Sequence, residues 1–209
     1  MTDSPGRPRR ESLAERRARR ATVDDPEVVL TAAFRYLEAR ARSVTETRRR
    51  LADAGYRPEL VEGAVERLLA IGLLDDDLFA RGWVESRDRA RPRGEAALRR
   101  ELRLRGVAQA TVDAALEERR TERSAGRTMG DPLDGDEAPG DPDEAAARRL
   151  LERRRRDLDR VADPRKRRQR AYALLARNGF APGVAARVAA EAVGDAPPLE
   201  GDEAPDPFG

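Results

Sequence analysis

A glycine that ends a helix recurs three times in this chain, in the same local pattern each time. Gly55, Gly106 and Gly179 each follow a leucine by four residues and precede an apolar or aromatic residue. Apolar residues then recur six and ten positions after each glycine, as Val61 and Val65, Val112 and Leu116, and Ala185 and Ala189. Because one short repeat cannot bury its apolar stripe alone, the pattern predicts a linear array of small helical modules, a shape suited to lying along a large partner.

Helix start and stop signals give each module three helices. Asp25 followed by Pro26 is typical of a helix N-terminus, and Ser43 followed three residues later by Glu46 matches a capping box. No sustained alternation of β-branched residues predicts a strand. We therefore predict an all-α fold of tandem three-helix repeats, three modules in an elongated curved array, with disordered N- and C-terminal tails.

Shifts in composition set the predicted boundaries. Residues 1–24 are rich in arginine and poor in apolar residues, and residues 125–141 combine glycine and proline with acidic residues. The predicted organisation is a basic disordered tail over 1–24, three-helix repeats over 25–72, 73–124 and 142–194, an acidic Gly/Pro linker over 125–141, and an acidic disordered tail over 195–209.

The residue inventory argues against catalysis. The chain has no cysteine and no histidine, which removes thiol nucleophiles, Cys/His metal sites and imidazole acid–base chemistry. The acidic run Asp75-Asp76-Asp77 is interpreted as a helix cap, with a Mg²⁺ site as the alternative. No phosphate-binding loop or nucleophile elbow is present. We expect no enzymatic activity, no cofactor and no metal.

Apolar runs are short throughout. None approaches the roughly 18 residues that a membrane span requires, and the N-terminus lacks the apolar core of a signal peptide. We therefore expect a cytoplasmic protein that does not enter a membrane.

Positive charge gathers on the second helix of each repeat, although the net charge is only +2. GC-rich coding can explain arginine in place of lysine, but it does not sort charges along a chain. The recurrence predicts a basic stripe that binds phosphate backbones or an acidic protein groove; a solvated helix face with local ion pairs is the alternative. The candidate binding residues are Arg48, Arg49, Arg91, Arg93, Arg99, Arg100, Arg103, Arg105, Arg165, Lys166, Arg167, Arg168 and Arg170.

Aromatic residues are few and lie mostly at helical core spacing. We interpret them as core residues, with stacking on nucleic-acid bases as the alternative. They are Phe34, Tyr36, Tyr56, Phe79, Trp83, Tyr172 and Phe180.

The second repeat carries three motifs in close succession: the acidic run and Phe-Ala-x-x-Trp-Val pattern of residues 73–84, Arg91-Pro92-Arg93-Gly94, and the Leu-x-x-Glu-Leu pattern of residues 98–107. In these motifs the repeat resembles the RecX regulatory proteins, which modulate the RecA recombinase. The match is looser over the other two repeats, and both tails lie outside it. Two features depart from the family pattern: the acidic insertion over 125–141, and Asn178 in place of a basic residue.

The resemblance implies a regulator that binds the RecA–DNA filament along its groove. Such a protein modulates, and mainly inhibits, recombinase, ATPase and co-protease activity in DNA repair and the SOS response. The implied partners are the RecA filament and single- or double-stranded DNA, which would contact the basic faces; we expect the chain to be a monomer.

Two other classes of function fit the same residues. A general nucleic-acid-binding helical-repeat protein could act through the arginine stripe alone, with binding that falls steeply as salt rises. A helix-turn-helix transcription factor is the other, and sequence-specific binding to duplex DNA would favour it.

Overall fold

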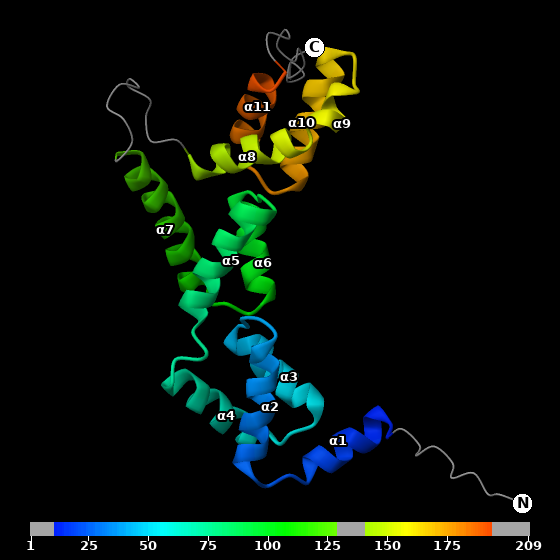
Figure 1. Ribbon diagram of the computed structural model, residues 1–209, viewed down its shortest axis with the longest axis vertical. Coiled ribbons are helices and arrows are strands. Elements are labelled where there is room, and N and C mark those ends of the chain that lie inside the picture. The colour runs from blue at the N-terminus through cyan, green and yellow to red at the C-terminus, as the bar shows by residue number, and fades with distance from the viewer. Residues whose placement is uncertain (1–10, 129–140, 194–209) are drawn as a thin grey trace, which may run out of the picture. The chain divides into compact units, whose positions relative to one another are not determined.

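The part of the chain that the structure describes is all-helical. The structure, a computed structural model, describes residues 11–128 and 141–193, with the backbone alone for 122–128. These residues form eleven α-helices and no strand, as the sequence predicts (Figure 1). Within this described part, no helix is long and apolar enough to cross a bilayer.

The helices follow one another with short connections. Their bounds are α1 Leu13–Ala21, α2 Pro26–Glu38, α3 Val44–Ala54, α4 Pro58–Ala70, α5 Asp76–Ala90, α6 Glu95–Leu104, α7 Gln109–Thr128, α8 Pro142–Arg153, α9 Arg155–Asp159, α10 Pro164–Arg177 and α11 Pro182–Glu191.

Local signals start these helices where the sequence predicts. The Asp25 side chain accepts a hydrogen bond from the Glu27 N–H at the start of α2, and Ser43 and Glu46 form the predicted capping box of α3. Asp163 caps α10 in the same way as Asp25 caps α2. The Asp75 carboxylate accepts from the backbone N–H groups of the first turn of α5 at 2.8 and 2.9 Å, so the interpretation of the acidic run as a cap is confirmed.

The described chain divides into two compact units. The first contains residues up to Ala80 together with Arg103–Thr111, and the second contains Arg81–Leu102 together with residues from Val112 onward. The division therefore passes through α5, α6 and α7, the helices of the second repeat.

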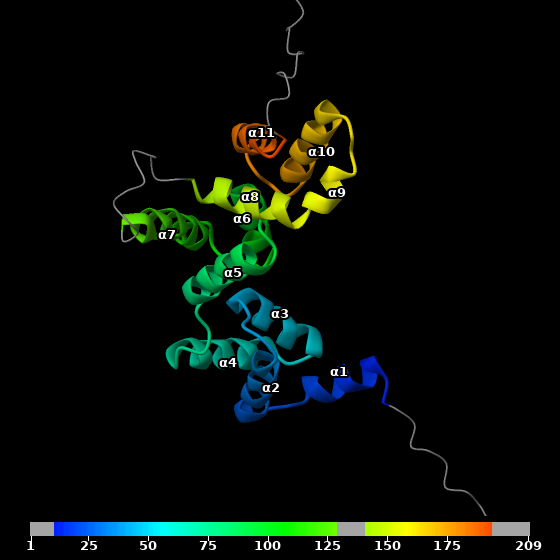
Figure 2. The same cartoon turned by 45° about the horizontal axis from the view of Figure 1, so that its top comes forward.

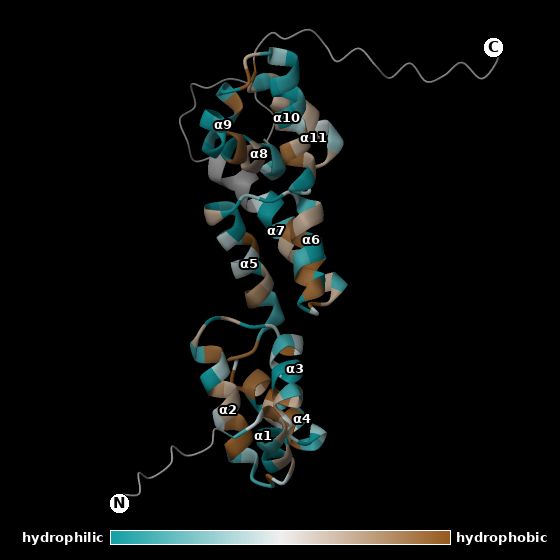
Figure 3. Cartoon of the chain, turned by 90° about the vertical axis from the view of Figure 1, so that its right-hand side faces the viewer, coloured by the Kyte–Doolittle hydropathy of each residue, from teal (hydrophilic) through white to brown (hydrophobic). Residues whose placement is uncertain are grey.

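In the first unit, α2, α3 and α4 pack around one apolar core (Figure 1). Its buried residues recur at helical spacing, with Val61, Val65 and Leu68 on one face of α4. Leu51 of α3 and Leu30 of α2 complete the centre. Hydrophobic stripes alternate with hydrophilic segments along these helices, as Figure 3 shows. Burial of these stripes holds the three helices together.

In the second unit, α8, α10 and α11 form a similar three-helix group, with the short α9 beside α10 (Figure 2). The core is rich in alanine, which lets the helices approach closely. Its largest buried members are Leu151, Leu158, Leu175 and Phe180. In place of the three helices predicted for this repeat there are four, because α8 ends at Arg153 and a separate short helix, α9, places Leu158 in the core.

Two boundaries differ from the predicted organisation. Residues 13–21 lie in the predicted disordered tail but form α1, because a Ser12–Glu15 capping box starts the helix and α1 contacts α3. The predicted linker begins too early, since α7 continues through Thr128. At its other end Asp141 caps α8. The calls for 1–10, 129–140 and 194–209 lie outside the described residues.

Candidate functional site: arginine surface and module junctions

The predicted binding arginines fall into two groups according to what they contact. The first group is engaged by acceptors of the chain itself. Arg48 makes two parallel hydrogen bonds to Glu62 at 2.7 and 2.9 Å, and Arg99 bonds both Asp113 and Glu95. The remaining engaged members are Arg93, paired with Glu101 and Asn178; Arg105, paired with Glu46; and Arg167, which donates to the Val161 carbonyl. Pairing within the chain leaves these arginines less free to neutralise a partner.

The second group is exposed and makes no ion pair within the described residues. On α3 and α6 it comprises Arg49, Arg100 and Arg103, and elsewhere it comprises Arg91, Arg165, Lys166 and Arg170. Arg168 belongs to neither group, because it is half-buried on α10. Free, solvated guanidinium groups are the ones that can exchange water for phosphate or carboxylate oxygens at low cost.

The N-terminus of α3 also forms a junction in the first unit. The buried Ser43 Oγ donates to the Arg105 carbonyl at 2.6 Å, and the Thr45 hydroxyl donates to the Gly106 carbonyl at 3.1 Å. Arg105 returns an ion pair to Glu46 at 2.7 Å. The turn that ends α6 thus packs on the first turn of α3 and is hydrogen-bonded to it.

The same kind of junction occurs in the second unit, between the N-terminus of α6 and the turn that ends α10. The Gly94 N–H donates to the Asn178 carbonyl at 3.1 Å, and Arg93 bonds the Asn178 side chain. A Cβ on Gly179 would lie 2.5 Å from the Ala97 Cβ, so the two backbones approach closely. Asn178, which departs from the family pattern, is therefore a junction residue.

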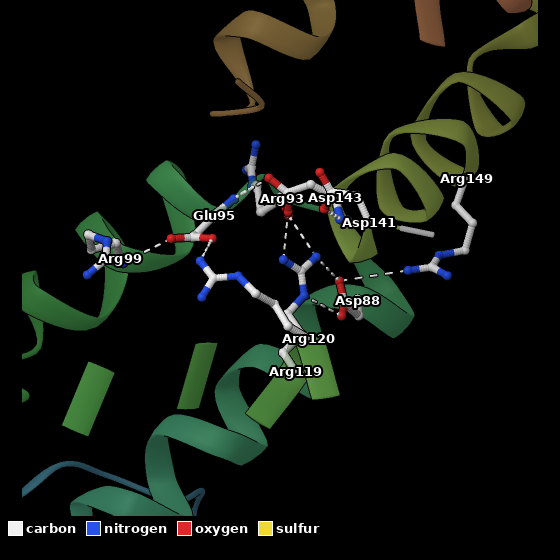
Figure 4. A network of polar contacts seen from close by, with 9 residues as sticks. All are labelled: Asp88, Arg93, Glu95, Arg99, Arg119, Arg120, Asp141, Asp143 and Arg149. Carbon is white, nitrogen blue, oxygen red and sulfur yellow. Dashed lines mark hydrogen bonds and ion pairs between the residues drawn. The ribbon is translucent and has the colours of Figure 1, made fainter. Parts of the chain in front are cut away.

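A buried ionic network ties α5, α7 and α8 together beside this junction (Figure 4). Arg119 of α7 is 6% exposed; its Nε and Nη2 each donate to Asp88 at 2.9 Å, and its Nη1 donates to Asp143 at 2.6 Å. Asp143, in the first turn of α8, also accepts from the Glu95 N–H at 2.9 Å. One guanidinium thus joins the second and third repeats across the insertion.

Burial and pairing act against each other in this network. Burial is the largest single influence on the Arg119 guanidinium and lowers its pKa, but the hydrogen bonds and charges of Asp88 and Asp143 together outweigh burial, so the pKa is raised overall. Burial is also the largest influence on Asp143, and it raises the pKa of that carboxyl despite the bonds from Glu95 N–H and Arg119. Asp143 therefore depends on Arg119 for its charge compensation, whereas Asp88 also lies 3.8 Å from the Arg149 guanidinium.

Sequence reasoning did not select Arg119. A signal was present, because Val112, Leu116 and Arg119 lie at helical spacing on the apolar face of α7. A charged residue on a core stripe indicates a buried partner of opposite sign.

Trp83, predicted as a core residue with base stacking as the alternative, is half-buried. Its Nε1 donates to Glu101 at 3.0 Å, and the Arg87 guanidinium lies 4.0 Å from the ring centre. Among the described residues, no group of three potential ligands is placed to hold a metal ion.

Comparison with known proteins agrees with this geometry. Three family models match in chain order: the first three-helix domain of RecX over residues 30–68, the second over 75–116 and the third over 142–188. The regulatory protein RecX of Streptomyces lividans is 37% identical over 151 residues, which cover 70% of each chain. The chain belongs to the RecX family.

Other RecX proteins extend the likeness. That of Thermobifida fusca is 34% identical over 74% of this chain and 80% of its own length. The crystal structure of RecX from Lactobacillus salivarius matches 79% of this chain and 94% of its own with a TM-score of 0.61. At 15% identity that structure supports the fold alone. Helix α1 and residues 125–141 lie outside the three RecX domains.

Proposed function

We propose that this RecX-family chain is a non-enzymatic, cytoplasmic regulator that binds the RecA–DNA filament and inhibits its recombinase, ATPase and co-protease activities. The observation that carries the proposal is the match of all three three-helix domains to a family whose members are named regulatory proteins. The basic second helices supply contacts for a polyanionic partner, and a monomer would act by occupancy, for which no catalytic residue is needed.

The arginines that contact RecA or DNA in this proposal are those of the exposed group. Arg100 and Arg103 of α6 are the strongest candidates for these contacts, because both are exposed and neither makes an ion pair within the described chain. By contrast Arg99, on the same helix, is bound by Asp113 and Glu95. A substitution at Arg99 would therefore change the fold's own pairing as well as any partner contact.

The direct test is the rate of ATP hydrolysis by RecA on single-stranded DNA with increasing amounts of this chain. Inhibition near stoichiometric amounts supports the proposal. Unchanged hydrolysis, together with DNA binding that falls steeply with the logarithm of salt concentration, would contradict it and favour a general nucleic-acid-binding protein.

Reversing both free charges of α6, as Arg100→Glu with Arg103→Glu, should raise the concentration for half-inhibition at least about tenfold. The reason is that two contacts to an anionic partner become repulsive, while no pair within the described residues is broken. The matched control is Arg35→Glu with Arg156→Glu, an equal change of charge at exposed positions of α2 and α9 that make no ion pair within the described residues. The concentration of this control variant that gives half-inhibition should stay within about twofold of that of the unmodified chain. Equal losses of inhibition in both variants would show that the effect depends on net charge alone and not on the position of the arginines.

A further inference from the structure

Helix α1 occupies a face that is built like the two junctions between modules. At each junction, the carbonyl just before a helix-ending glycine accepts a hydrogen bond: Arg105 from Ser43, and Asn178 from Gly94. In the first module the corresponding carbonyl, that of Ala54, accepts from the Arg20 side chain of α1 at 3.4 Å. Helix α1 therefore takes the place that the preceding module takes at the other two turns.

The close approach at the glycine recurs as well. A Cβ on Gly55 would lie 2.8 and 2.9 Å from the Arg17 backbone, so α1 packs directly on the turn. Gly55 has φ of 101°, which ends α3 in the left-handed conformation. We call the Ala54 carbonyl, Gly55 and the Tyr56 ring the Gly55 face.

The Gly55 face favours a cation. The C-terminus of α3 carries the negative end of the helix dipole, and no basic residue lies in its own last turn. Arg20 supplies that charge from α1, with its guanidinium 5.7 Å from the centre of the Tyr56 ring. A helix that presents arginine to the turn is therefore the ligand that fits this face.

Helix α1 is held much less firmly than the modules are held to one another. It has no buried residue, its Leu13 is 74% exposed, and its bond to Ala54 is long. The corresponding donor at the first junction, Ser43, is fully buried and bonds at 2.6 Å. A contact with little buried area and one long hydrogen bond opens readily.

The third module lacks an equivalent docking position at the start of its second helix. The helix-ending glycine lies twelve residues after Ser43 and Gly94, but sixteen after Asp163, so α10 has an extra turn. Arg167 stands at the position that aligns with Ser43, and its Nε donates to the Val161 carbonyl. The N-terminus of α10 therefore cannot bind the turn of a following module in the way that the N-termini of α3 and α6 do.

We propose that the Gly55 face is a second protein-binding surface, that its ligand is a basic helix of a partner protein, and that α1 is its resident, exchangeable occupant. A partner helix with arginines spaced like Arg17 and Arg20 displaces α1 and takes over its contacts. This surface lies on α3 and the turn that follows it, and it goes beyond the proposed action on RecA.

The test uses the full chain and a fluorescent peptide with the sequence of residues 11–22. Ala18→Pro breaks α1 and leaves the Gly55 face unchanged, because Ala18 is exposed in the middle of that helix. The tethered α1 competes at millimolar effective concentration. The Ala18→Pro chain should therefore bind the peptide at least about tenfold more tightly than the unmodified chain.

Two further variants locate the binding. Ala18→Pro with Gly55→Asn should bind at least tenfold more weakly than Ala18→Pro alone, because asparagine tolerates the left-handed turn while its Cβ meets the docked backbone. Ala18→Pro with Gly72→Asn is the control: Gly72 has φ of 70° and open space around it, so binding should be unchanged. Equal helicity of the two double variants by circular dichroism shows that neither has unfolded.

The proposal is overturned by any of three results: no binding to Ala18→Pro, equal binding to Ala18→Pro and the unmodified chain, or undiminished binding when Gly55 is replaced. The assay contains neither RecA nor DNA, so its outcome is independent of the proposed function.

Discussion

Replacing Arg119 with alanine should lower the free energy of unfolding of the second unit by about 3–5 kcal/mol. The guanidinium is nearly inaccessible to solvent and donates three hydrogen bonds to two carboxylates. Its removal leaves Asp143, itself 6% exposed, with the Glu95 N–H as its remaining donor from another segment. An unpaired buried carboxylate costs more than the pair itself contributes, because its desolvation is no longer offset.

Unfolding in urea followed by the fluorescence of Trp83 would measure this loss. Trp83 is the single tryptophan of the chain, and it lies on α5 in the same unit as Arg119. The matched control is Arg120→Ala, the next residue along α7, which is exposed and pairs with Glu95 and Glu117. That change should cost less than about 1 kcal/mol. Equal losses for Arg119 and Arg120 would contradict the assigned role of the buried network.

A second variant separates charge from packing. Arg119→Met combined with Asp88→Asn and Asp143→Asn removes the charge of Arg119 together with those of its two carboxylate partners, while keeping similar volumes. It should recover part of the stability that Arg119→Ala loses, because replacing a whole buried ionic group is far less costly than removing one partner. No recovery would show that the shape of the arginine side chain matters more than its charge.

Helix starts and helix ends could be predicted because their causes lie within a few residues. Asp25 and Ser43 cap their helices through donors two and three residues away, and that geometry depends only on local sequence. The second role of Ser43 could not be predicted. Its hydroxyl donates to the carbonyl of Arg105, 62 residues later, and the partner is defined only once the repeats are folded.

The candidate site shows the same limit. The sequence predicts which helices are basic, but not which arginines are already paired. Arg99 and Arg100 are neighbours on α6, but Arg99 is held by Asp113 of the next helix as well as by Glu95 of its own, whereas Arg100 makes no ion pair within the described residues. Arg105 is likewise paired with Glu46, which lies 59 residues earlier. Pairing between distant segments thus divides a charge run that looks uniform in the sequence.

The junction of α6 and α10 gives the other large expected effect. Gly179→Asn should lower the free energy of unfolding by about 2–4 kcal/mol, because a Cβ there would lie 2.5 Å from the Ala97 Cβ and 2.6 Å from the Ala97 nitrogen. Because one of the clashing atoms is the backbone nitrogen of Ala97, a change of side-chain rotamer cannot relieve the clash. Asparagine is the informative substitution because it adopts the left-handed conformation that Gly179 has, with φ of 83°.

Gly72→Asn measures how much of the stability lost in Gly179→Asn comes from placing asparagine in the left-handed conformation. Gly72 also has a positive φ, at 70°, but a Cβ there meets nothing within 4 Å. Its replacement should cost no more than about 1 kcal/mol. Denaturation of both variants in urea gives the difference, which measures the close approach of the two modules at Ala97. If the two variants lost equal stability, Gly179 would serve only to end α10, and the second and third repeats would be held together by the Arg119 network and the bonds of Asn178 instead.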